Sequence, residues 1–100
     1  MTYANVGTLG CVPGGRDRLV EILTRRSVDL EQAGCLLYEV GVSDEQPDTV
    51  FVAELWTSAA AHQGSLELDS VRAAIREARP LLTGDMGGFR FEVVGSPLRD

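Results

Sequence analysis

The order in which strand-like and helix-like segments follow one another constrains the fold of this chain most. Short runs rich in Val, Phe, Tyr and Leu alternate with polar residues as half-buried strands do, and two longer stretches place apolar residues at helical spacing. In chain order the sequence predicts strands or helices at 3–11, 16–33, 35–42, 50–56, 59–79 and 89–94. The first, third, fourth and sixth segments are strands, and the second and fifth are helical.

The order β-α-β-β-α-β is the split pattern of ferredoxin-like domains. It predicts an α+β fold in which two helices cover one face of a four-stranded antiparallel sheet. With 100 residues, the chain forms a single domain over 1–100.

Local signals place the boundaries of these elements. Pro13-Gly14 ends the first strand, and residues 16–33 form one long amphipathic helix that Gly34 terminates. The helical region 59–79 breaks near 64–69, where Ser70 caps a fresh helix, and Pro80 ends it. A glycine-rich connection over 81–88 precedes the last strand.

Alternation along the last two strands assigns their side chains to two faces of the sheet. The set expected to face the helices is Phe51, Ala53, Leu55, Phe89, Phe91 and Val93. The set expected on the other face is Val50, Val52, Glu54, Trp56, Arg90, Glu92 and Val94. This second set mixes apolar and charged side chains. It favours a symmetric homodimer in which two sheets face each other around a polar-lined pocket.

Composition excludes several functional classes. The net charge of −6 and the scattered basic residues argue against nucleic-acid binding. The apolar runs are too short to span a membrane, and the amino-terminal residues do not resemble a secretory signal, so we expect a cytoplasmic protein. Cys11 and Cys35 lack metal-site spacing, and with one His the sequence predicts no metal.

The segment 50–66 contains the only Trp and the only His of the chain. An apolar strand ends in Glu54-x-Trp56, and Ser58 then supplies an N-cap oxygen to an alanine-rich helix that carries His62. We expect any functional site to lie near this corner.

Three motifs give the chain a resemblance to a known family. They are Pro13-Gly14 after the first strand, Gly34-Cys35 leading to Tyr38, and Glu54-x-Trp56-x-Ser58-x-x-Ala61 at the corner. With these motifs the whole chain resembles the antibiotic biosynthesis monooxygenase (ABM) family, whose members are small dimeric α/β-barrel proteins of ferredoxin-like fold.

The resemblance implies an oxygenase that needs no metal, flavin or other cofactor. Its substrate would be a small electron-rich aromatic metabolite such as a quinol, an anthrone or a polyketide-like compound, which after deprotonation donates an electron to dioxygen. We expect the site between sheet and helices, with Asn5 and His62 as catalytic residues. The expected substrate-binding residues are Trp56, Tyr38, Ser65 and Arg90.

One position departs from the family pattern. Family members usually carry a His four residues beyond the corner Ala, where this chain has Ser65. The haem-degrading branch would place its iron ligand at Ile75, which cannot bind iron, so the resemblance does not extend to haem degradation. A non-catalytic dimeric small-molecule-binding protein and a cofactor-free isomerase of the same fold therefore remain alternatives.

Each candidate residue also has a purely structural interpretation. Trp56 can anchor the dimer interface, His62 can lie on the helix surface, and Asn5 can satisfy a backbone group at the sheet edge. For Glu54 and Arg90, a structural ion pair within or between subunits is a better expectation than catalysis.

Overall fold

A computed structural model describes residues 1–99 of the chain. Its strands are β1 (Thr2–Cys11), β2 (Cys35–Ser43), β3 (Gln46–Trp56) and β4 (Leu82–Val93). Its helices are α1 (Arg16–Leu23), α2 (Val28–Gln32), α3 (Ala59–Ser65), α4 (Asp69–Ala78) and the short 3-10 helix η1 (Arg79–Leu81).

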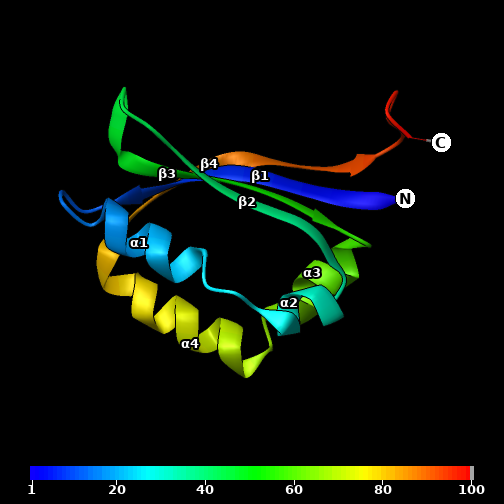
Figure 1. The fold of residues 1–100 in the computed structure, drawn as a ribbon, viewed down its shortest axis with the longest axis horizontal. Helices are drawn as coiled ribbons and strands as arrows, with labels where there is room; N and C mark the ends of the chain where they lie inside the picture. The colour runs from blue at the N-terminus through cyan, green and yellow to red at the C-terminus, as the bar shows by residue number, and fades with distance from the viewer. Residues whose placement is uncertain (100) are drawn as a thin grey trace.

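The four strands form one antiparallel sheet in the order β2-β3-β1-β4. All the helices lie on the same side of this sheet (Figure 1). The predicted ferredoxin-like α+β fold is therefore confirmed. We call the sheet surface that faces the helices the inner face, and the opposite surface the outer face.

The first helical region is two helices, not the single helix that the sequence predicts. α1 ends at Leu23, where the Thr24 hydroxyl donates a hydrogen bond to the carbonyl of Val20. The Ser27 hydroxyl then caps α2 by accepting a hydrogen bond from the amide of Leu30. Serine and threonine hydroxyls compete for backbone partners in this way, which favours a helix break that apolar spacing does not reveal.

The second helical region breaks as predicted, between α3 and α4. The predicted cap is wrong, because Leu68 is the N-cap of α4 and the Ser70 hydroxyl donates instead to Asp29 Oδ2, at 2.6 Å. The predicted loop over 81–88 is also wrong, since β4 begins at Leu82. Its glycines allow a strand here because they let β1 and β4 approach closely.

The predicted assignment of side chains to the two faces is reversed. Val50 is fully buried and joins Leu19 and Ile22 of α1 in the core, and Trp56 is 1% exposed, so this set lies on the inner face. Phe89 lies on the outer face and is 76% exposed. Val50, Phe51 and Val52 are consecutive apolar residues of β3, so periodicity gives the alternation but not which set meets the helices.

Candidate functional site

A row of four polar side chains crosses the inner face, one from each strand. Backbone pairing places Glu54 of β3 opposite Tyr38 of β2 on one side and opposite Asn5 of β1 on the other. Asn5 is in turn opposite Arg90 of β4. We call Tyr38, Glu54, Asn5 and Arg90 the polar row. Directly opposed residues of an antiparallel sheet share a face, so strand register alone brings these four together.

Glu54 is the centre of the hydrogen bonding in this region. Its Oε2 accepts a hydrogen bond from Nδ2 of Asn5 at 3.2 Å, and its Oε1 accepts one from Nε1 of Trp56 at 3.0 Å. Nε2 of His62 lies 3.9 Å from the same Oε1. The Glu54 side chain is only 13% exposed, so this carboxyl group is held in a largely desolvated position.

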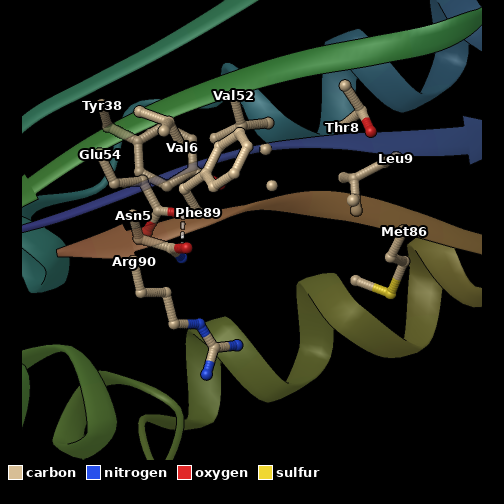
Figure 2. A pocket seen from close by; sticks show the side chains of 13 residues that line it. Asn5, Val6, Thr8, Leu9, Tyr38, Val52, Glu54, Met86, Phe89 and Arg90 are labelled. Carbon is tan, nitrogen blue, oxygen red and sulfur yellow. Dashed lines mark hydrogen bonds between the residues drawn. The ribbon is translucent and has the colours of Figure 1, made fainter.

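A cavity of about 570 Å³ opens beside the polar row, and all four of its residues line it. This volume lies within the range of about 300–1,000 Å³ that small-molecule pockets occupy. Apolar side chains including Leu9 and Val52 complete the walls, and Arg90 and Met86 project from β4 on the side where α4 lies (Figure 2). Met86 is 70% exposed, so the cavity opens to solvent along β4.

His62 lies behind Glu54 and does not line the cavity. Its ring packs between two aromatic rings, with centroid distances of 5.8 Å to Tyr3 and 5.3 Å to Trp56, the latter edge-on at 64°. The His62 side chain is 11% exposed. The imidazole can therefore reach a molecule in the cavity only through the carboxyl group of Glu54.

Burial dominates the electrostatics of the polar row. It raises the pKa of the Glu54 carboxyl, and the Trp56 hydrogen bond, the charge of His62, the Asn5 hydrogen bond and the charge of Arg90 offset only part of that effect. Burial also raises the pKa of the Tyr38 hydroxyl strongly, with further contributions from Glu54 and Cys35. Tyr38 is therefore a neutral hydrogen-bond donor at physiological pH.

The structure brings together most of the residues that the sequence singles out. Asn5, Tyr38 and Arg90 line the cavity, whereas Trp56 and His62 lie next to it, on the far side of Glu54. Ser65 is 2% exposed, and its hydroxyl donates to the backbone carbonyl of His62 at 2.6 Å, so it points away from the cavity.

Glu54 lines the cavity, although the sequence predicts a structural role for it and not a place among the site residues. Within residues 1–99 its carboxylate lies 3.9 Å from Nε2 of His62, and no ion pair joins it to Arg90 of the same chain. An ion pair between Glu54 and Arg90 of two subunits stays a prediction. The Glu54-x-Trp56 spacing carried a signal, because alternate residues of a strand share a face and the indole N–H can then reach the carboxylate.

In residues 1–99 no three His, Cys, Asp or Glu side chains gather in a way that would hold a metal ion. None of the helices in this range is long and apolar enough to cross a bilayer.

Known proteins resemble the chain over nearly its whole length. A protein from Chloroflexus aurantiacus J-10-fl, provisionally named an antibiotic biosynthesis monooxygenase, is 33% identical, with 96% of each chain covered and a TM-score of 0.83. A similarly named protein from Deinococcus radiodurans is 28% identical, with 96% of this chain and 95% of that chain covered and a TM-score of 0.71. A similarly named protein from Caulobacter crescentus CB15 is 22% identical, with 94% of this chain and 91% of that chain covered, and shares the fold with a TM-score of 0.77.

No protein of curated function matches the chain. The model of the family described as antibiotic biosynthesis monooxygenase matches residues 2–77. This match and the neighbouring structures support a general monooxygenase-like function, and proteins of this family are generally homodimeric and bind small molecules. The chain belongs to the antibiotic biosynthesis monooxygenase family.

Proposed function

We propose that this protein is a cofactor-independent monooxygenase that oxidises a small phenolic metabolite, such as a quinol or an anthrone, with dioxygen. The observation that carries the proposal is the cavity of about 570 Å³ with the polar row along one wall. An apolar pocket with a few convergent polar groups suits a flat aromatic molecule that carries hydroxyl or carbonyl oxygens.

The reaction balances without an added reductant. The substrate phenol, which for an anthrone is its enol tautomer, loses its proton, and the phenolate passes one electron to dioxygen. The two radicals combine to a carbon-bound peroxide, which loses water. For an anthrone, the methylene carbon becomes a carbonyl, one oxygen atom stays in the quinone product, and the other leaves as water with the two hydrogens.

The residues of the polar row have roles that match this sequence of steps. Arg90 is always cationic and offsets the charge of the phenolate. Asn5 and Tyr38 are neutral donors for substrate oxygens, with Asn5 able to use the second N–H of its amide. Leu9 and Val52 keep the reacting carbon in an apolar environment, which limits competing reactions with water.

In this proposal the functional molecule is a homodimer of two copies of the chain. The outer face carries a shallow groove of about 500 Å³ lined by Val6, Phe51, Ala53 and Phe89 among others. Phe89 and Phe91 are 76% and 49% exposed. An apolar surface of this kind on a small domain favours association, and two outer faces packed together would bury it.

Oxygen consumption tests the function directly. The purified protein is incubated in chelator-treated buffer with a panel of hydroquinones and anthrones, and oxygen uptake is followed together with incorporation of ¹⁸O from labelled dioxygen. We expect one labelled oxygen atom per quinone product. Asn5→Ala should weaken turnover, whereas Ser43→Ala, at the end of β2 and outside the cavity, should not. The absence of protein-dependent uptake with every compound would sink the proposal.

One observation favours a second function, that of a non-catalytic small-molecule-binding protein. Ser65 stands where family members usually have His, and its hydroxyl is bonded to the backbone and buried. A binder would take up the same quinols and anthrones, detected by calorimetry, without consuming oxygen.

A further inference from the structure

We propose that Glu54 is the base that removes the phenolic proton, and that His62 is a positioning residue that acts through Glu54. This inference rests on the proposed function and names the proton acceptor in the same site. The carboxylate of Glu54 touches the cavity on one side and faces His62 on the other.

The geometry leaves the carboxylate free to accept a proton. Oε1 is occupied by the Trp56 indole N–H and faces His62, whereas Oε2 receives one hydrogen bond, from Asn5. Each carboxylate oxygen has two lone-pair directions, so Oε2 retains one for a substrate hydroxyl. The Asn5 and Trp56 donors fix the carboxylate plane, which pre-orients this lone pair.

The other titratable groups of the cavity are unsuited to this task. In residues 1–99 the lining side chains that titrate are Tyr38, Glu54 and Arg90. Burial raises the pKa of Tyr38, so it stays protonated, and a guanidinium does not release its proton in a protein. His62 lies outside the cavity, with its ring between Tyr3 and Trp56.

The groups that surround Glu54 set the pH at which it ionises. Tyr38 and Cys35 of β2 face it, as do His62 of α3 and Arg90 of β4. Burial outweighs the electrostatic contributions of His62 and Arg90 and the hydrogen bonds from Trp56 and Asn5, so the pKa of Glu54 is raised. A raised pKa brings the carboxyl closer to a phenol in proton affinity and makes the transfer less unfavourable.

The proton transfer balances as a closed cycle. The phenolic O–H bond breaks, its electron pair stays on the substrate oxygen, and a new O–H bond forms on Oε2 of Glu54. Glu54 is then neutral beside the anionic substrate. When the peroxide loses water, the proton on Glu54 leaves with the departing oxygen, and the carboxylate is restored.

The first test is the pH dependence of turnover in Glu54→Gln, with a hydroquinone as substrate and Glu67→Gln as the control. Glu67 is a 76% exposed carboxylate outside the cavity. We expect Glu54→Gln to lower kcat by about 10²–10⁴-fold with little change in KM. The loss should shrink as the pH rises, because the substrate then arrives already deprotonated. A wild-type kcat in this variant, or a loss that is equal at every pH, would overturn the inference.

Two further variants separate catalysis from folding. Glu54→Asp keeps a carboxylate and should retain more activity than Glu54→Gln. His62→Ala removes an electrostatic interaction that lowers the pKa of Glu54, so the rise of kcat with pH should move to higher pH while the plateau stays within a few fold. A lower plateau with an unmoved pH profile would remove His62 from its positioning role.

The second test does not depend on oxygen chemistry. Trp56 is the only tryptophan and donates to Glu54, so its fluorescence should report the ionisation of that carboxyl. The step in the fluorescence titration that belongs to Glu54 is the one that persists in His62→Ala and is absent in Glu54→Gln. Saturation with 4-cyanophenol, which dioxygen does not oxidise, should move this step to lower pH, because the phenol hydrogen-bonds to the ionised form.

The two tests distinguish a wrong proposed function from a wrong inference about Glu54. If 4-cyanophenol shifts the titration but no phenol or anthrone consumes oxygen, the proposed function is wrong and the contact between Glu54 and phenols stands. If oxygen is consumed but Glu54→Gln behaves as wild type, only the inference about Glu54 is wrong. A titration that 4-cyanophenol does not move contradicts the inference in either case.

Discussion

The strongest structural prediction concerns Gly88, where β4 lies against β1 at the wall of the cavity. Gly88 has a φ of +141° and is paired with Gly7. A Cβ atom at this position would lie 2.1 Å from the carbonyl oxygen of Val6, a contact that side chains do not tolerate. Gly88→Ala must therefore separate the two strands or change the backbone conformation.

The expected destabilisation has two contributions. A non-glycine residue in this region of φ costs about 1–3 kcal/mol, and forcing extra volume into packed backbone costs about 1–3 kcal/mol more. Together they give a loss of about 2–6 kcal/mol in the free energy of unfolding. Because Gly88 lines the cavity, the same variant should also weaken the binding of phenols.

Urea denaturation followed by circular dichroism measures this loss, at one fixed protein concentration so that any association is held constant. Gly64→Ala is the matched control, because a Cβ there meets nothing within 4 Å and the residue lies in α3. It should stabilise the protein by about 0.5–1 kcal/mol. A Gly88→Ala protein that unfolds within about 0.5 kcal/mol of wild type would refute the reasoning, since that is the scatter of neutral surface changes.

Three further predictions follow from burial and charge. Burial raises the pKa of Glu54 above its ordinary value of 4.5, so the wild-type protein should lose stability as the pH rises from 4.5 through the raised pKa. Glu54→Gln should not show this loss, and melting temperatures measured across this pH range test the difference. Phe89→Asp should convert a dimer to a monomer in sedimentation measurements, whereas Val28→Asp, on α2, should not. Leu19→Ala should cost about 2–5 kcal/mol in unfolding free energy, against less than about 0.5 kcal/mol for Leu98→Ala at a 92% exposed position.

The arrangement of elements could be predicted because strands and helices leave different periodicities in a sequence. The signals that placed them, such as Pro13-Gly14 and the Ser58 cap, act within a few residues. Local signals of this kind also predicted the break between α3 and α4. The sequence does not predict the break at Thr24–Ser27, because the apolar spacing continues across it. Only the Thr24 hydrogen bond at the end of α1 and the Ser27 cap of α2 mark it.

Which side chains of the sheet face the helices could not be predicted, for a different reason. Val50 and Phe51 are both large and apolar, and which of them meets the helices depends on the packing of Leu19 and Ile22. The polar row was equally inaccessible, because Asn5 and Glu54 are separated by 49 positions along the chain. Only the register of β1 against β3 brings them together, and no local pattern determines that register.

The position of Glu54 links the stability of the fold to its proposed chemistry. The carboxyl group lies beside Trp56, which is 1% exposed, and its raised pKa means that the surrounding donors and cations do not fully compensate its desolvation. A neutral side chain of the same size should therefore make the folded protein more stable at neutral pH. Catalysis by a base instead requires the carboxylate, since a carboxylate whose desolvation is incompletely compensated accepts a proton more readily. Glu54→Gln should accordingly unfold at a higher temperature and turn over more slowly, and both changes together would distinguish a base from a structural anchor.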